Sequence, residues 1–330
     1  GSYKGDNGLT YFDINDFDES ALAPAHWDLL RCLTSLLLAA RQFDASTAKA
    51  ARLGEAFTAA YAAALTQGSA RWIERSTAQG LVGKLLKSLR RRTQAGLLDH
   101  YGDAGRRRRS IRIDGKKSLA VTRPEHDLVA GLMATAMVQG GISSSVEVID
   151  VARRVVGTAS LGLDRYIVLV RGGQAGAAEY QLLDLKQARP SSLQPHLGTD
   201  QPDWPSPAHL QVAIERRMQA VPMALLHPLL DAQQSWVLRA IQPSEDRIDL
   251  SAAGVSLADV RGVVEDMGRL LAWAQLRSSG RQWTAKADEL VEFGARHAAW
   301  SADLLNTAKV CADQVRSDWK AWRRAATNTL

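Results

Sequence analysis

The sequence has few of the residues that mark secreted, zinc-binding or membrane-spanning proteins. Among its 330 residues are two cysteines, Cys32 and Cys311, which give neither a disulfide framework nor a zinc-type spacing. Its seven histidines are scattered, with no pair at metal-ligand spacing, which argues against a metal bound through imidazole. No apolar run approaches the roughly 20 residues that a bilayer-spanning helix needs, and no signal peptide is visible. We therefore expect a cytoplasmic protein without a membrane span.

Aromatic side chains are also scarce where positive charge is densest. The net charge of +6 is concentrated between Lys84 and Arg123, where only Tyr101 is available to stack on a base. Besides Lys84 and Arg123 themselves, the basic residues of this stretch include Arg90 to Arg92, Arg106 to Arg109, Arg112, Lys116 and Lys117. A nucleic acid or another acidic surface is one partner for such a stretch, and a solvated helix face followed by a turn is the favoured alternative.

Apolar residues at three- and four-residue spacing predict helices over much of the chain. Between Pro24 and the alanine-rich stretch, the residues that recur in this way are Trp27, Leu30, Leu33, Leu36 and Leu37. Further helices are expected over residues 45–65, 70–98, 124–139 and 209–220, and from residue 256 almost to the end. The stretch 112–121 is expected to form a short exposed strand or hairpin.

The pattern changes to strands after Gly141. Residues 146–156, 166–170 and 180–186 are rich in β-branched and aliphatic side chains and predict an antiparallel meander, and residues 235–242 predict a further strand. Residues 187–207 hold five of the ten prolines and are expected to form a long surface loop. The predicted organisation is a helical lobe over 1–140, a β-rich lobe over 141–250 and a second helical part over 251–330.

A glycine-bracketed turn lies between the first two predicted strands. Its candidate phosphate-contacting residues are Gly157, Thr158, Ala159, Ser160 and Gly162. Glycine lets backbone amides approach phosphate oxygens, and the hydroxyl of Ser160 adds a donor. An ordinary β-turn is the alternative, because glycines bracket many hairpins.

A lysine ends the third predicted strand. Alternation places Leu182, Asp184 and Lys186 on one face, and Lys186 stands where a lysine that pairs with phosphate is expected after a glycine loop. Glu215, in the helix that follows, is the candidate carboxylate partner of Lys186. The alternatives are a solvated lysine and a glutamate that faces water.

Two acidic residues close a short apolar segment near the start of the chain. Asp16 and Asp18 lie among Phe12, Ile14 and Phe17, and such carboxylates could hold Mg²⁺ against phosphate oxygens. Acids that form a turn ahead of Pro24 are the alternative. Asp28 is expected to be structural.

These motifs together carry a resemblance. Asp16 to Asp18, Pro24 and Asp28 resemble the acidic metal-binding segment of aminoglycoside phosphotransferases. More closely, nearly the whole chain resembles the bacterial domain-of-unknown-function 2252 family. The motifs that carry this are Asn15 to Glu19, Trp27 to Leu29, Arg154 to Gly157, Ser160 to Gly162, Lys186 to Ala188, Arg217 to Gln219, Trp236 to Arg239, Ala312 to Gln314, Asp318 and Trp319.

The resemblance implies an α+β, protein-kinase-like two-lobe fold in permuted order, since kinases place the glycine loop before the acidic segment. It implies ATP and Mg²⁺ as cofactors and an unidentified phosphoryl acceptor. Family members carry a Gly-Asp-x-His-x-x-Asn-Phe segment that would lie just before Gly1, so the chain is expected to be truncated, with its catalytic residues upstream. Ala159 stands where a second loop glycine is expected and narrows the room for phosphate.

The sequence therefore predicts a kinase-like ATP-binding protein that acts as a phosphotransferase. A non-catalytic kinase-like binding module is the second hypothesis, and Ala159 favours it. A basic module that binds nucleic acid or an acidic surface through residues 84–123 is the third.

Overall fold

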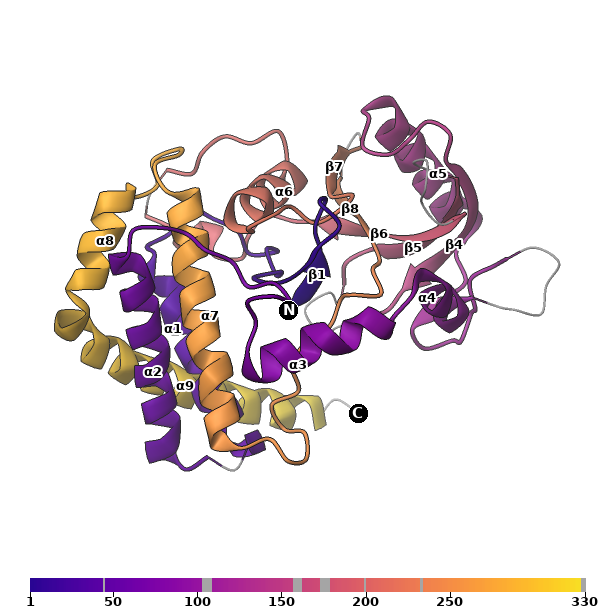
Figure 1. The fold of residues 1–330 in the computed structure, drawn as a ribbon. Coiled ribbons are helices and arrows are strands. Elements are labelled where there is room, and N and C mark those ends of the chain that lie inside the picture. Colours follow the sequence, from indigo (N-terminus) through magenta and orange to yellow (C-terminus); the bar gives the residue numbers. More distant parts are fainter. Residues whose placement is uncertain are drawn as a thin grey trace. The chain divides into compact units, whose positions relative to one another are not determined.

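The structure, a computed structural model, describes residues 1–43, 45–102, 109–156, 162–172, 179–198, 200–231 and 234–327. The chain forms two compact units (Figure 1), and both are assembled from separate stretches of sequence. Unit 1 comprises residues 1–21, 74–76 and 85–247, and unit 2 comprises residues 22–73, 77–84 and 248–330. The fold class is α+β, as predicted.

Unit 1 is built on a six-stranded antiparallel sheet. Its strands are β3 (Ser118–Leu119), β4 (Glu147–Arg154), β5 (Arg165–Arg171), β6 (Tyr180–Ala188), β7 (His227–Leu230) and β8 (Ser235–Ala240). They are ordered β3-β4-β5-β6-β8-β7, which confirms the predicted meander of β4, β5 and β6. The sequence pattern did not predict β7, because proline, here Pro228, is disfavoured inside a strand. The structure places β7 at the sheet edge, where a proline costs no ladder hydrogen bond.

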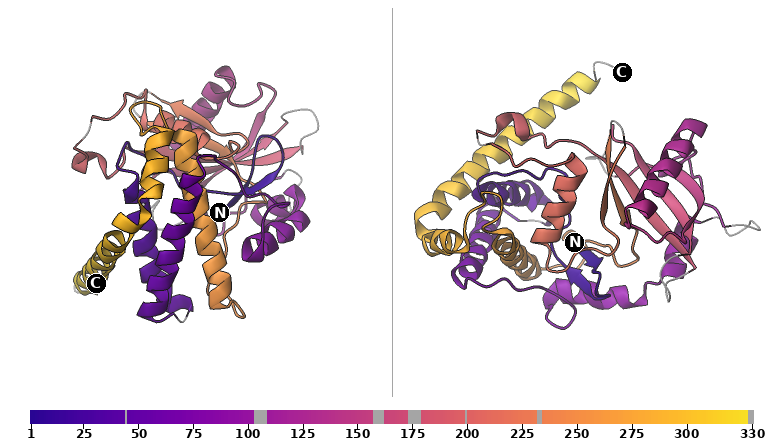
Figure 2. Two further views of the ribbon diagram at one scale, coloured as in Figure 1. Left: turned by 60° about the vertical axis from the view of Figure 1, so that its left-hand side comes forward. Right: turned by 90° about the horizontal axis from the view of Figure 1, so that it is seen from above.

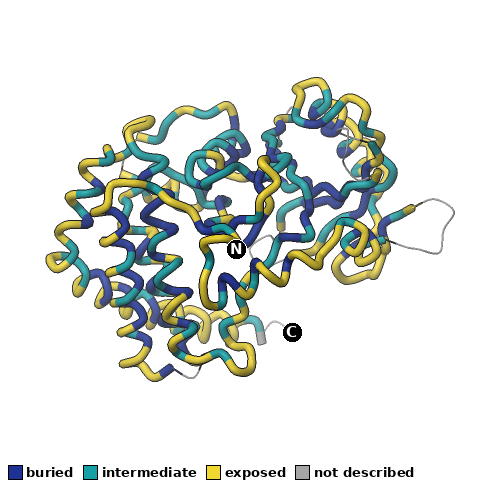
Figure 3. Tube along the Cα trace, viewed as in Figure 1, coloured by how far each residue is buried: buried dark blue, intermediate teal, exposed yellow. Residues whose placement is uncertain are grey.

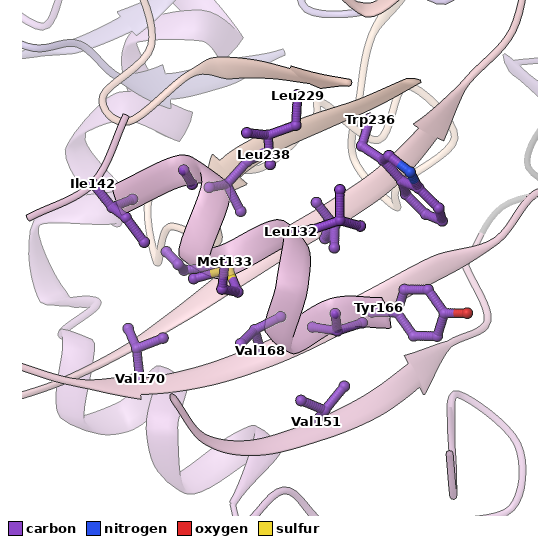
Figure 4. Close-up of a cluster of buried hydrophobic side chains, with 14 residues drawn as sticks. Leu132, Met133, Ile142, Val151, Tyr166, Val168, Val170, Leu229, Trp236 and Leu238 are labelled. Atoms are coloured by element: carbon purple, nitrogen blue, oxygen red, sulfur yellow. The ribbon is translucent and has the colours of Figure 1, made fainter. Parts of the chain in front are cut away.

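Helix α5 (Arg123–Val138) covers one face of this sheet. Its buried residues, with Leu132 and Met133 at the centre, pack on side chains that point from alternate positions of the strands, as Figure 4 shows. Tyr166 and Val168 of β5 lie on this face, whereas Ile167 points to the opposite face. Because β5 is buried on both faces, both sets of alternating side chains are apolar, and its sequence is a continuous apolar run.

A two-stranded hairpin, β1 (Ser2–Lys4) and β2 (Thr10–Phe12), packs in the same unit. The rings of Tyr3 and Tyr11 stack with their centroids 6.0 Å apart. Both contact a cluster that includes Val212 of helix α6 (Pro207–Met218) and Met223. The start of the chain is therefore anchored beside α6, which follows it by some 200 residues.

Unit 2 is helical. It contains α1 (His26–Ala39), α2 (Thr47–Thr66), α7 (Leu257–Ser278), α8 (Ala287–Ala295) and α9 (His297–Thr327). Helix α2 packs on α7 and α8, and α1 packs on α9. Along α2 and the first half of α7, buried and exposed residues alternate in the pattern of amphipathic helices (Figure 3), whereas residues 270–276 of α7 are all buried. The buried stripe of α1 is Leu29, Leu33 and Leu37, so the predicted Trp27, Leu30 and Leu36 are only half-buried.

The predicted helix over residues 70–98 is wrong. Residues 69–79 are not helical, and helical structure begins at α3 (Gly80–Ser88), continues as a 3₁₀ turn (Leu89–Arg91) and restarts as α4 (Gln94–Tyr101). The restart has a local cause, because Arg92 is extended and the Thr93 hydroxyl accepts a hydrogen bond from the Gly96 amide as a helix cap. Of the predicted strand or hairpin over 112–121, only β3 is a strand. The residues before it form a turn, in which the Asp114 carboxylate accepts hydrogen bonds from the amides of Lys116 and Ser118.

Within the described ranges, none of the helices combines the length and the apolar character that crossing a lipid bilayer would require.

Candidate functional site

The candidate site in unit 1 centres on an ion pair between Lys186 and Asp18. Lys186 lies near the end of β6, and its ammonium contacts the carboxylate of Asp18. The Lys186 side chain is largely buried, whereas 37% of the Asp18 side chain remains exposed. The structure therefore brings together two of the residues predicted from distant motifs, and leaves one of them open to solvent.

Helix α6 contacts the acidic segment, residues 13–19, through a stripe of polar side chains. Gln211, Glu215 and Gln219 are spaced four residues apart, so they share one face of the helix, and all three are buried. The Gln211 amide donates to the backbone oxygen of Asp18 at 3.2 Å. The Gln219 amide donates to the backbone oxygen of Ile14 at 3.0 Å. The stripe thus fixes the backbone on either side of Asp16.

Two further carboxylates brace the ends of this segment. The buried Asp13 accepts hydrogen bonds from the amides of Ile14, at 2.9 Å, and Ala220, at 3.0 Å. Glu19 accepts from the amide of Ser192 at 2.7 Å and from the hydroxyls of Ser191 and Ser192 at 2.9 Å each. The acidic segment is consequently bonded at one end to Ala220, the second residue after α6, and at the other to the loop that follows β6.

Asp16 is exposed, and its carboxylate has no hydrogen-bond or ion-pair partner within the described part of the chain. The described residues contain no cluster of three or more His, Cys, Asp or Glu side chains that could hold a metal ion. Magnesium in phosphoryl-transfer sites is commonly bound by one or two carboxylates, with water and phosphate oxygens completing its octahedron. Asp16 and Asp18 fit that smaller donor set.

Glu215 does not pair with Lys186 as expected, because Lys186 pairs with Asp18. The Glu215 carboxylate accepts a hydrogen bond from Gln219 at 3.2 Å. Burial raises the pKa of Glu215 from 4.5 to about 7, opposed by the charge of Arg239 and the Gln219 hydrogen bond. The charges of Glu245 and, last, Asp18 add to this rise in pKa. Gln219, which bonds both Glu215 and the backbone of Ile14, links Glu215 to the acidic segment.

Asp184, two residues before Lys186, lies on the same face of β6 and is fully buried. Its carboxylate accepts hydrogen bonds from Arg154 at 2.8 Å, from Arg165 at 2.6 and 2.8 Å, and from Arg239 at 3.1 Å. Burial alone would raise the pKa of Asp184, but these guanidiniums hold it well below its usual range. This cluster links β4, β5, β6 and β8, and its carboxylate lies two residues from Lys186 on β6.

Of the predicted glycine loop, Gly157, Thr158, Ala159 and Ser160 lie outside the described residues. Gly162 is described, and its φ of 79° is a left-handed conformation that glycine adopts readily. Its carbonyl accepts a hydrogen bond from Arg189 at 2.8 Å, which ties this end of the turn to the end of β6.

The basic stretch between residues 84 and 123 is partly engaged within unit 1. Arg92 forms an ion pair with Asp246, and Arg112 donates to the backbone oxygen of Gly102 at 3.0 Å. Arg109 lies over the ring of Tyr180, with 5.5 Å between the guanidinium carbon and the ring centroid. Arg106, Arg107 and Arg108 lie outside the described residues.

Asp28 lies in unit 2, near the start of α1, and its carboxylate accepts a hydrogen bond from the buried Gln275 of α7 at 3.1 Å. The side-chain oxygen of Gln275 also accepts a hydrogen bond from the hydroxyl of Tyr61, at 2.5 Å. Asp28 therefore takes part in a contact between helices, which agrees with the structural role that we expect for it.

The family model described as an uncharacterized protein conserved in bacteria (DUF2252) matches residues 1–325. The chain belongs to this family. Neither a curated protein nor a solved structure gives a significant match. The residues that form the candidate site all lie within the part of the chain that the DUF2252 model covers.

Sequence reasoning missed the residues that support Asp18. Glu19, Gln211 and Gln219 were not predicted as site residues, although the spacing of four between Gln211, Glu215 and Gln219 was a visible signal of a polar helix face. Asp13 gave no such signal, because its role depends on where the end of α6 lies.

Proposed function

We propose that this chain binds a nucleotide with Mg²⁺ through unit 1 and is a kinase-like phosphotransferase of an acceptor yet to be identified, with its lobes in permuted order. The observation that carries the proposal is the contact between Lys186 and Asp18. In such a site a lysine that contacts phosphate and a carboxylate that binds the metal lie close together, because the phosphate and the metal contact each other.

The arrangement of unit 1 supports the same function. Lys186 lies on the third strand of the meander β4-β5-β6, and Gly162, with its left-handed backbone, lies three residues before the start of β5. In protein kinases the lysine that pairs with the nucleotide phosphates is likewise on the third strand, and a helix with a glutamate follows it. Here α6 follows β6 and presents Glu215 to the site.

Each side chain has a defined task in this proposal. Asp18, with Asp16 beside it in the chain, holds Mg²⁺, which when bound neutralises charge on the phosphate oxygens. Lys186 leaves Asp18 and contacts a phosphate group. The stripe of Gln211 and Gln219 keeps the acidic segment fixed, so that little rearrangement is needed when the ligand arrives.

The test is calorimetric binding of ATP to the wild type, Lys186→Ala and Asp18→Asn, with and without Mg²⁺. We expect Lys186→Ala to weaken binding by about 10- to 100-fold in both conditions, because a charge-assisted contact to phosphate is lost. We expect Asp18→Asn to weaken binding only when Mg²⁺ is present. Arg171→Ala is the control, because Arg171 forms an exposed ion pair with Glu147 on the same sheet.

Unchanged ATP affinity in both site variants, or no saturable binding by the wild type, would refute the proposal. Binding by the full-length protein without release of ADP or phosphate, in the presence of candidate acceptors, would favour the alternative, a non-catalytic kinase-like binding module. The sequence gives a reason for such an outcome, because the methyl group of Ala159, where a glycine is expected, reduces the space for phosphate in the loop.

A further inference from the structure

We propose that the last turns of α9 form a membrane-surface segment that binds anionic lipid. One face of α9 packs within unit 2. Leu304, Leu305, Ala308 and Ala312 are buried, and their spacing places them on one side of the helix. Helix α1 packs on α9, and Arg316 donates to the backbone oxygen of Leu37, close to the end of α1.

The apolar stripe continues past the end of α1. Val315, Trp319 and Trp322 follow Ala308 and Ala312 at three- and four-residue spacing, so they extend the same face. They are exposed, the two tryptophans by 53% and 67%. In both views of Figure 2 the last turns of α9 extend beyond the other helices of unit 2. From Ala312 the helix runs on for about 22 Å at its normal rise per residue.

The charges on this segment indicate which kind of partner binds the exposed apolar face of α9. Residues 316–324 contain four basic residues and one acidic residue, Asp318. Lys320 and Arg324 have no acidic partner among the described residues. Arg323 lies over the ring of Trp319, with 4.8 Å between the guanidinium carbon and the ring centroid, so a positive charge borders the apolar face.

An anionic bilayer matches this combination. Helices that lie in the membrane interface carry tryptophan on one face and lysine or arginine on the other. Tryptophan prefers the interface, where its ring is buried and its N–H stays hydrated. A second copy of the chain fits less well, because a symmetric contact over the same stripe would bring two sets of basic residues together.

The proposal does not require α9 to cross the bilayer, and it does not depend on nucleotide binding in unit 1. The experiment is co-sedimentation of the full chain with vesicles of phosphatidylcholine alone or mixed in equal parts with phosphatidylglycerol. We expect binding to the mixed vesicles only, weakened by added salt. Trp319→Ala/Trp322→Ala and Lys320→Glu/Arg324→Glu are each expected to reduce binding by about tenfold or more.

Two control variants isolate the segment. Trp72→Ala removes another tryptophan of unit 2 that is 51% exposed, and Lys49→Glu/Arg52→Glu, at two exposed positions of α2, changes the net charge by the same amount as the reversal on α9. Both are expected to bind as the wild type does. Absence of vesicle binding by the wild type, or equal binding by all variants, would overturn the proposal. Self-association in light scattering that the tryptophan variant abolishes, without lipid binding, would assign the stripe to a second copy instead.

Discussion

The ammonium of Lys186 and the carboxylate of Asp18 form an ion pair across 168 positions of sequence. Partly exposed ion pairs contribute little to folding, because water screens them and ordering the side chains costs entropy. We therefore expect Lys186→Met and Asp18→Asn each to change the free energy of unfolding by about 1 kcal/mol or less. A double-mutant cycle in urea denaturation measures the coupling. A coupling above about 3 kcal/mol would identify the pair as a structural clamp, not as a binding pair.

Glu215 gives the site a specific pH dependence. Burial raises its pKa from 4.5 in the unfolded chain to about 7 in the folded one. The folded state therefore holds this proton more tightly, and the stability that it contributes is fully present below pH 4.5 and is lost as the pH rises through 7.

A Glu215→Gln variant has no proton to lose at this position. Between pH 4.5 and 7 we expect the wild type to lose stability relative to this variant, by an amount on the order of 3 kcal/mol. Urea denaturation of both proteins at a series of pH values measures the difference. Parallel stability curves over that range would show that Glu215 is solvated in the folded protein.

The strand pattern of unit 1 was predictable because each strand carries its own local signal. The period of two assigned Leu182, Asp184 and Lys186 to one face, and in the structure Leu183 packs on the opposite face beneath α5. Strand β7 could not be predicted in the same way, because it is short and contains Pro228. Only its place at the sheet edge makes this strand acceptable.

The candidate site was predictable only in part. Motif resemblance selected Asp18 and Lys186, which contact each other, but it gave Lys186 the wrong partner in Glu215. Which carboxylate a lysine reaches depends on tertiary packing, here on the bonds of Gln211 and Gln219 to the acidic segment. Sequence spacing contains no information on those bonds until the position of α6 is known.

Asp184 is expected to be the most sensitive carboxylate in unit 1. Its replacement by asparagine removes the charge that compensates the guanidiniums of Arg154, Arg165 and Arg239. Removing one partner of a buried charge network typically costs about 3–5 kcal/mol. Thermal and urea denaturation should therefore show a strong loss of stability in Asp184→Asn. Glu147→Gln, which breaks an exposed ion pair with Arg171, is expected to cost about 0.5 kcal/mol or less. Similar losses in the two variants would contradict the compensating role of Asp184.

Two glycines of α7 provide a matched test of helix packing in unit 2. A Cβ atom at Gly268 would lie 2.4 Å from the backbone oxygen of Phe57 and 3.1 Å from the amide nitrogen of Tyr61, both in α2. A Cβ atom at Gly262 would meet nothing within 4 Å. Both residues lie within the same helix, so their intrinsic preferences for helical structure are equal.

We expect the same substitution to have opposite effects at these two positions. Gly262→Ala should stabilise unit 2 by up to about 1 kcal/mol, because alanine has the higher helix propensity. Gly268→Ala should destabilise it by about 2 kcal/mol or more, since the contact is with backbone that cannot rotate away and α2 and α7 must move apart. Urea denaturation followed by helical circular dichroism measures both changes. If alanine stabilises the protein equally at the two positions, α2 and α7 do not approach as closely as the structure has them.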